Sequence, residues 1–210
     1  MAYAVRTISQ LIDIHVHGAR THDTATRRQD DILSIAEIHG QRGTGAIVPT
    51  VYPGAIESMR ENMTAIRKAM SSQRAGAAIL GIHLEGPFLN AERAGCLDGK
   101  SFQEPSPKRL SSLIDGFEDV IRIITIAPEL PGALKLIETC RKKGFLVQMG
   151  HSDATFEQAE EGKQAGATGI THLFNAMRGF HHREPGLAGF GLMDDDLYVE
   201  VIADLAHLHP

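Results

Sequence analysis

Five side chains of metal-binding types lie where apolar runs of the sequence end: His15, His17, Glu85, His151 and His172. His15 and His17 are two residues apart, so on an extended strand both side chains point to the same face. Imidazole nitrogens and a carboxylate that converge on one point suit a divalent transition metal. Each residue alone is more often structural or solvent-exposed, but the convergence of five favours a metal site.

Two further residues flank this set. Asp13 shares the strand face of His15 and His17, and we expect its carboxylate to orient one of the two imidazoles. His207 follows the last apolar run of the chain. Taken alone, it is more often a structural residue than a ligand, for example a surface histidine in a frayed C-terminal segment.

Seven apolar runs predict the β-strands that carry these residues. They are residues 10–18, 45–52, 77–86, 120–129, 145–151, 169–174 and 198–204. Helical patterns separate them at residues 30–42, 55–73, 106–116, 131–143 and 155–165. Apolar runs bounded by glycine and proline, each followed by a helix, are typical of parallel strands that are covered on both faces.

The predicted fold class is therefore α/β: a (β/α)8 TIM barrel with seven of its eight strands, in a single domain over residues 1–210. A doubly wound open sheet is the alternative, but no G-x-G-x-x-G turn follows the first strand. Polar residues lie at the end of nearly every strand, which is the active-site face of a barrel, and this pattern favours the barrel over the open sheet. A seven-stranded barrel has two unpaired strand edges, which is unfavourable for folding alone.

Composition narrows the class of protein further. The 210 residues carry a formal net charge of -5, with 42% hydrophobic and 22% charged residues, as in a globular protein. Without a cluster of Lys and Arg, this charge argues against a nucleic-acid partner. Cys96 and Cys140 are too few for a disulfide framework or a cysteine-based zinc site. The low cysteine count favours a reducing, cytoplasmic setting. No apolar stretch reaches the roughly 20 residues of a membrane span, so we expect no membrane partner.

Five sequence motifs occur along the chain in the order IDIHVHG, HLEGPF, GHSDAT, THLFNAM and REPGLAG. With them, the chain from about residue 11 to its end resembles the N-acetylglucosamine-6-phosphate deacetylases of the amidohydrolase superfamily. HLEGPF and HLFNAM are the diagnostic motifs, whereas IDIHVHG alone indicates only the wider superfamily. The resemblance implies a barrel fold, a divalent metal (Zn²⁺ or else Fe²⁺), an amino-sugar phosphate substrate and a homodimer.

The resemblance also implies roles for individual residues. Glu85, His151 and His172 would be ligands of the main metal ion, and His15 and His17 would help to hold a second ion. Asn175 and Ala176 would meet the sugar phosphate, Arg183 would pair with the phosphate, and His207 would contact the substrate. Arginine suits a phosphate because its planar fork offers two donors. The alternative for Arg183 is a loop ion pair with Glu184 or another neighbour.

The implied reaction is hydrolysis of an N-acetyl amide by a metal-activated water, with an aspartate at the end of strand eight to move the proton. His207 or a nearby donor could stabilise the oxyanion. The chain reaches Pro210 before an eighth strand, so this aspartate is not in it. The charge run 194–196 is expected to be a solvated loop and a poor replacement. Residues 1–10 are too short to supply the small β-rich domain of the family, so we expect a truncated protein.

Two substitutions depart from the motifs of the family. Leu97 stands where the family commonly has a histidine near the acetyl group, which leaves the exact substrate open. Leu205 replaces the glycine of an Ala-Asp-Gly-x-His motif, and this would shift the loop of His207 if the glycine serves a close backbone approach. Two alternatives to the sugar-phosphate deacetylase remain. One is an amidohydrolase for another N-acyl or cyclic amide, and the other is a catalytically inactive metal-binding module.

Overall fold

The computed structural model describes residues 10–209. Its seven principal strands are β1 (Leu11–Val16), β4 (Thr44–Val51), β6 (Ile82–Glu85), β7 (Ile121–Ile126), β8 (Leu146–Met149), β9 (Gly169–Ile170) and β10 (Tyr198–Val199). They are hydrogen-bonded in this order and all pairs are parallel. A short strand, β5 (Ala78–Ile79), also pairs with β4. Each strand adds next to its predecessor, without the reversal of order that defines a doubly wound sheet, and the barrel-type prediction is confirmed.

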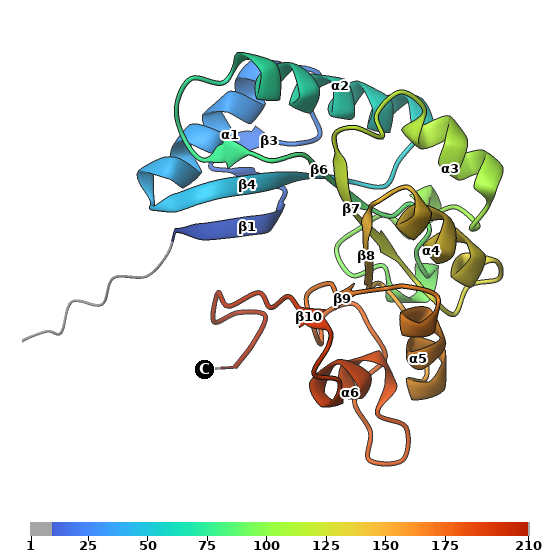
Figure 1. Cartoon of the computed structure of the whole chain (residues 1–210). Helices are drawn as coiled ribbons and strands as arrows, with labels where there is room; N and C mark the ends of the chain where they lie inside the picture. The colour runs from blue at the N-terminus through green and yellow to red at the C-terminus, as the bar shows by residue number, and fades with distance from the viewer. Residues whose placement is uncertain (1–9, 210) are drawn as a thin grey trace, which may run out of the picture.

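The sheet curves, with β1 at one end and β10 at the other. Figure 1 shows the helices on the outer side of this arc and the chain after β10 turning back toward β1. The five predicted helices are confirmed as α1 (Gln29–Gln41), α2 (Ile56–Ser72), α3 (Pro107–Ile114), α4 (Ala133–Lys142) and α5 (Phe156–Gln164). A small antiparallel pair, β2 (Gly18–Ala19) and β3 (His22–Asp23), and two 3-10 turns, η1 (Ala91–Arg93) and η2 (Gly99–Ser101), were not predicted.

A sixth helix, α6 (Gly186–Met193), was also missed by the sequence reading. Its sequence GLAGFGLM has no polar face and contains three glycines, so it lacks the amphipathic period by which a helix is recognised. The glycines allow close packing. A Cβ on Gly191 would lie 2.3 Å from Ile170 Cδ1 of β9, so a side chain there would push α6 off the sheet.

The core lies between the curved sheet and the outer helices. Along α2, Met59, Met63 and Ile66 are buried at the spacing of one helical face. Isoleucines and valines of β4, β7 and β8 form the opposing surface. Within residues 10–209, none of the helices has the length and apolar character needed to cross a bilayer. The expectation about a missing β-rich domain rests on residues 1–10, of which 1–9 lie outside the described part of the chain.

Candidate metal centre

The structure brings the five predicted metal-binding side chains together around Glu85, which closes β6. Glu85 Oε1 lies 3.1 Å from His15 Nε2, 3.1 Å from His151 Nε2 and 3.2 Å from His172 Nε2. Glu85 Oε2 lies 3.1 Å from His17 Nε2. These residues come from or directly follow β1, β6, β8 and β9, so the parallel strands deliver them to one edge of the sheet. Only 2% of the Glu85 side chain is exposed.

Backbone carbonyls determine the tautomers of His151 and His172. His151 Nδ1 lies 3.0 Å from Arg93 O, and His172 Nδ1 lies 3.1 Å from Asn175 O. A carbonyl oxygen only accepts, so both Nδ1 atoms carry the hydrogen, and each neutral imidazole presents a lone pair at Nε2. These two Nε2 atoms are 3.1 Å apart, and both face Glu85 Oε1. Three electron pairs thus converge at one point.

This convergence fits a divalent cation. Lone pairs at such distances repel each other unless a positive charge lies between them. In a tetrahedral zinc site, with ligands at about 2.0–2.1 Å, the ligand atoms are about 3.3 Å from each other. The 3.1–3.2 Å separations of the Glu85, His151 and His172 atoms are close to that value. These three residues could therefore hold one ion.

A second group shares Glu85 with the first. His15 Nδ1 lies 3.1 Å from Glu200 Oε2, while His15 Nε2 lies 3.0 Å from His17 Nε2. The His17 ring stacks on Tyr52, with ring centroids 4.1 Å apart. Within residues 10–209, the buried atoms His17 Nδ1 and Glu85 Oε2 have no hydrogen-bond partner. His15, His17 and Glu85 could hold a second ion, which would satisfy the Glu85 oxygen.

The charges of the cluster are strongly coupled. Burial disfavours the Glu85 carboxylate, yet the surrounding imidazoles hold its pKa well below the ordinary value. Burial also opposes a charge on His15, but the carboxylates of Glu200 and Glu85 outweigh it and raise the pKa of His15 to about 10. A proton on His15 therefore competes with a cation for the same electron pairs.

The backbone around the centre is strained. His151, His172, Phe174 and Ala176 have φ angles of 46°, 32°, 74° and 50°, in the left-handed region that non-glycine residues rarely adopt. Each such residue costs about 1–3 kcal/mol, and such strain is typical of functional sites. These turns end the short final strands abruptly and aim both imidazoles at Glu85.

The role predicted for Asp13 is wrong. Asp13 Oδ1 accepts a hydrogen bond from the backbone N of His15 at 3.2 Å, and the ring of His15 is bound by Glu200 instead. Residues two apart on a strand are about 6.5 Å from each other, beyond the reach of a short aspartate side chain. Asp13 therefore forms a local bond to the backbone, as aspartates commonly do.

Glu200 and His83 were missed by the sequence reading. Glu200 lies between Val199 and Val201, and a lone charge inside an apolar run was the signal that could have revealed it. His83 is fully buried on the same strand as Glu85. Its Nδ1 lies 3.0 Å from Ile14 O and its Nε2 lies 2.9 Å from Thr125 Oγ1, so both ring nitrogens are engaged below the cluster.

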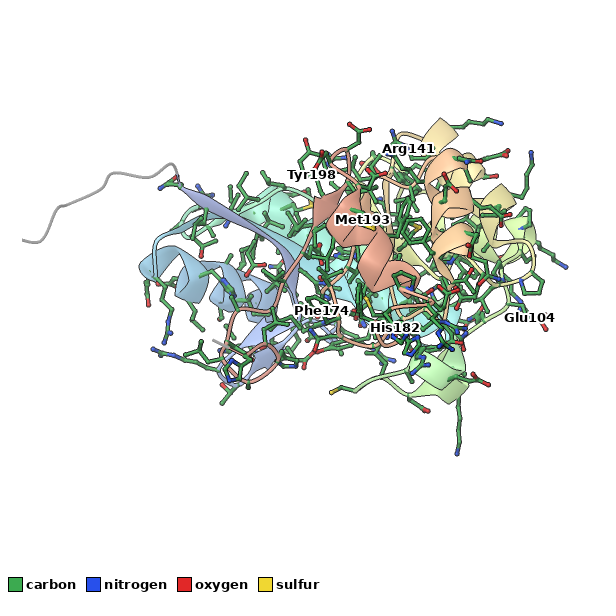
Figure 2. All side chains as sticks on the ribbon, turned by 90° about the horizontal axis from the view of Figure 1, so that it is seen from below. Glu104, Arg141, Phe174, His182, Met193 and Tyr198 are labelled. Atoms are coloured by element: carbon green, nitrogen blue, oxygen red, sulfur yellow. The ribbon has the colours of Figure 1, made fainter. Side chains whose placement is uncertain are left out.

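A pocket of about 900 Å³ opens over the cluster. Asn175 and Ala176, which were predicted to meet the substrate, line it together with Tyr52 and Leu97. Arg183 is exposed on the loop before α6, outside the lining of this pocket; its neighbour His182 is labelled at the surface in Figure 2. The alternative of an ion pair between Arg183 and Glu184 finds no support, because Glu184 Oε1 instead accepts from the backbone N of Phe156 and Gly186.

His207 also lines the pocket and is bound to its neighbour Asp204. His207 Nδ1 lies 2.8 Å from Asp204 Oδ2, and the backbone N of Ala206 and of His207 donate to Asp204 Oδ1. These bonds lower the pKa of Asp204 to about 2. Leu205, which follows Asp204, has a φ of 65°, in the left-handed region where a glycine would be unstrained.

The curved parallel sheet with a histidine–glutamate cluster at its strand ends defines a β/α-barrel protein with a candidate metal centre. Residues 10–210 match the model of the amidohydrolase family, so the chain belongs to this metal-dependent family. It is 36% identical over 200 residues to the N-acetylglucosamine-6-phosphate deacetylase of Vibrio furnissii, covering 95% of this chain and 50% of that protein. It is 34% identical to the N-acetylgalactosamine-6-phosphate deacetylase of Escherichia coli O157:H7, covering 95% and 53%.

A solved structure shows the same architecture. A mutant N-acetyl-D-glucosamine-6-phosphate deacetylase of Mycobacterium smegmatis, in complex with N-acetyl-D-glucosamine-6-phosphate, superposes with a TM-score of 0.88 at 32% identity. The match covers 95% of this chain and 51% of that one. The chain thus spans about half the length of the relatives that it matches.

Proposed function

We propose that this chain serves the hydrolysis of N-acetylglucosamine 6-phosphate to glucosamine 6-phosphate and acetate. Water adds to the acetyl carbon, the C–N bond breaks, and the amine nitrogen takes up a proton. The convergence of Glu85, His151 and His172 beneath an open pocket is the observation that carries the proposal. The names of the relatives supply the substrate.

Glu85, His151 and His172 would hold the main ion, and His15 and His17 would complete a second position. Nitrogen and oxygen ligands at tetrahedral separations favour Zn²⁺, with Fe²⁺ as the other candidate. A divalent cation there supplies Lewis acidity to the amide carbonyl and lowers the pKa of a water molecule. The burial of Glu85 keeps the site at low dielectric, where such charge effects are strong.

The residues of the pocket would bind and orient the sugar. The Asp204 carboxylate accepts from Nδ1 of His207, so a neutral His207 presents an accepting Nε2 to a sugar hydroxyl. A protonated His207 would instead donate from Nε2 to the carbonyl oxygen as negative charge develops there. Asn175 and Ala176 of the pocket lining would meet the sugar phosphate. Arg183, on the exposed loop outside this lining, would pair with the phosphate. The assembly would be a cytoplasmic homodimer with no nucleic-acid or membrane partner.

Two observations favour a second substrate or role. Leu97 lines the pocket in place of a polar residue, and one relative is named for N-acetylgalactosamine 6-phosphate. An epimeric sugar phosphate or another N-acyl compound is therefore the alternative substrate. A catalytically inactive metal-binding module is the alternative role.

The test is a substrate panel on the zinc-loaded chain, with acetate and free amine as readouts and ligand binding measured by calorimetry. We expect binding of N-acetylglucosamine 6-phosphate, a loss of at least about 10-fold in affinity for the sugar without its phosphate, and the loss of any hydrolysis in Glu85→Gln. Glu118→Gln, an exposed glutamate paired with Lys143, is the matched control.

Equal binding and equal turnover of the sugar with and without its 6-phosphate would contradict the proposed substrate. Tighter binding or faster hydrolysis of N-acetylgalactosamine 6-phosphate would identify this epimer as the substrate. Tight metal and sugar-phosphate binding without turnover would identify a binding module.

A further inference from the structure

We infer that Glu200 is a positioning residue of the second metal position, holding the imidazole of His15 so that Nε2 faces Glu85. The inference rests on the metal centre of the proposed function and adds a residue to it. His15 Nδ1 donates to Glu200 Oε2 at 3.1 Å, across 185 positions of sequence. This bond determines the tautomer of His15, because the nitrogen that donates to a carboxylate leaves the other with its lone pair.

Glu200 is itself held on three sides. Its backbone N donates to Ile170 O at 2.9 Å, and its backbone O accepts from Leu173 N at 2.8 Å. Its second carboxylate oxygen, Oε1, accepts from Gln148 Nε2 at 2.8 Å. The side chain is 13% exposed. Oε1 therefore has a donor from β8 and Oε2 a donor from β1, and the carboxylate cannot turn away without losing two hydrogen bonds.

The contacts of Glu200 continue below the cluster. Gln148 Oε1 accepts from Thr171 Oγ1 at 3.1 Å, and Thr171 Oγ1 lies 2.9 Å from Thr125 Oγ1. Thr125 contacts His83, whose Nδ1 lies 3.0 Å from the carbonyl of Ile14, the residue before His15. Side chains from β6, β7, β8 and the ends of β9 and β10 thus form a continuous series of contacts. The series begins at the ring of His15 and returns to the backbone carbonyl of the residue before it.

This path crosses the gap between the two ends of the sheet. β1 and β10 are not paired with each other, and the bond between His15 and Glu200 links the segments that carry them. The other two ligands differ in this respect, because His151 and His172 are oriented by carbonyls of nearby loops. Loss of the Glu200 carboxylate should therefore affect the second metal position and leave the first one intact.

Glu200 does not form a separate metal site with His15 and His83, although their ligand atoms lie within 4.8 Å of one another. Both ring nitrogens of His83 are engaged, one by a carbonyl and one by Thr125 Oγ1. His15 Nδ1 already donates to Glu200. No lone pair of His83 or of His15 Nδ1 is left for a cation, so Glu200 acts on the metal through His15.

The experiment compares the wild-type chain, Glu200→Gln and the matched control Glu118→Gln by zinc titration calorimetry and elemental analysis. The absorption spectrum of the Co²⁺-loaded protein reports the coordination geometry of the bound ions. A glutamine offers only one accepting oxygen for its two donors, so we expect the affinity for the second ion to fall by about 10–100-fold. The first ion should bind as in the wild type, and circular dichroism should show an unchanged fold.

A second variant makes the result decisive. His15→Ala removes the second position, and Glu200→Gln added to it should change the metal affinity no further. Two ions bound equally well by Glu200→Gln and the wild type, or a folded Glu200→Gln that loses both ions, would overturn the inference. A wild-type chain that binds one ion would also overturn it but leave the proposed function standing. A folded wild-type chain that binds none would refute the metal centre itself.

Discussion

At the scale of single residues, the cluster depends on a balance of protons on buried imidazoles. His83 is fully buried below the histidine–glutamate cluster, and this burial lowers its pKa to about 4. His15 has the opposite shift, to about 10, because two carboxylates surround it. The pKa values of two neighbouring histidines are therefore shifted in opposite directions from the ordinary value.

These shifts predict how the stability of the metal-free chain depends on pH. Between about pH 6.5 and 4 the unfolded chain binds a proton at residue 83 that the folded chain excludes, so stability falls as the pH falls through this window. The loss should be on the order of 3 kcal/mol, at 1.36 kcal/mol per pKa unit. The stabilisation from protonated His15 is complete below pH 6.5 and is lost as the pH rises toward 10.

Urea unfolding in the presence of a chelator at several pH values would measure this profile. His83→Gln keeps a hydrogen-bonding side chain that does not titrate in this range. It should reduce the fall in unfolding free energy below pH 6.5 (the acid limb) and leave the fall toward pH 10 (the alkaline limb) unchanged. A wild-type acid limb as shallow as that of His83→Gln would show that His83 takes up its proton in the folded chain.

At the scale of elements, α5 holds the turn that carries His151. Thr155 is its N-cap: the hydroxyl accepts from the backbone N of Gln158, and the Gln158 side chain accepts from the backbone N of Thr155. Three and two residues before Thr155, the hydroxyl of Ser152 and the backbone N of Asp153 donate to the carboxylate of Glu129. The cap and these bonds together fix the strained turn between β8 and α5.

Removal of this cap tests that arrangement. Thr155→Ala should lower the free energy of unfolding by about 1 kcal/mol, because it leaves backbone donors of the first helical turn unsatisfied. Thr155→Ser, which keeps the oxygen, should cost much less. Chemical denaturation of both variants would measure the difference, and equal stabilities would mean that the capping box contributes nothing to α5.

The elements themselves were largely predictable from the sequence. Seven apolar runs and five amphipathic patterns are local signals, and the structure confirms each of them with shifted ends. The missed helix α6 has no polar face, and the missed pair β2 and β3 is only two residues long in each strand. Both form because neighbouring segments pack against them, which a local pattern does not record.

At the scale of the whole molecule, a metal ion would connect strands that are distant in the sequence. Its proposed ligands follow or belong to β1, β6, β8 and β9, which span the curved sheet (Figure 1). A ligand that binds only the folded chain stabilises it by mass action.

Metal removal should therefore lower the thermal midpoint. At a zinc concentration of about 100 times the dissociation constant, the stabilisation is about 2.7 kcal/mol. Differential scanning calorimetry with and without a chelator would measure it. Glu85→Gln should show a low midpoint that zinc does not raise, and a zinc response equal to that of the wild type would contradict the assignment of Glu85.

Local patterns along the chain were enough to predict most strands and helices and the positions of Glu85, His15, His17, His151 and His172 at strand ends. Periodicity and strand-end placement are local properties, and parallel strands bring their ends to one edge whatever the details. The groups that orient these side chains became clear only from the three-dimensional contacts: Glu200 in place of Asp13 for His15, and carbonyls of nearby loops for His151 and His172. Such partners depend on the curvature of the sheet and the path of the loops, because a hydrogen bond forms only within about 3 Å. Neither the curvature of the sheet nor the path of the loops can be inferred from the spacing of residues along the chain.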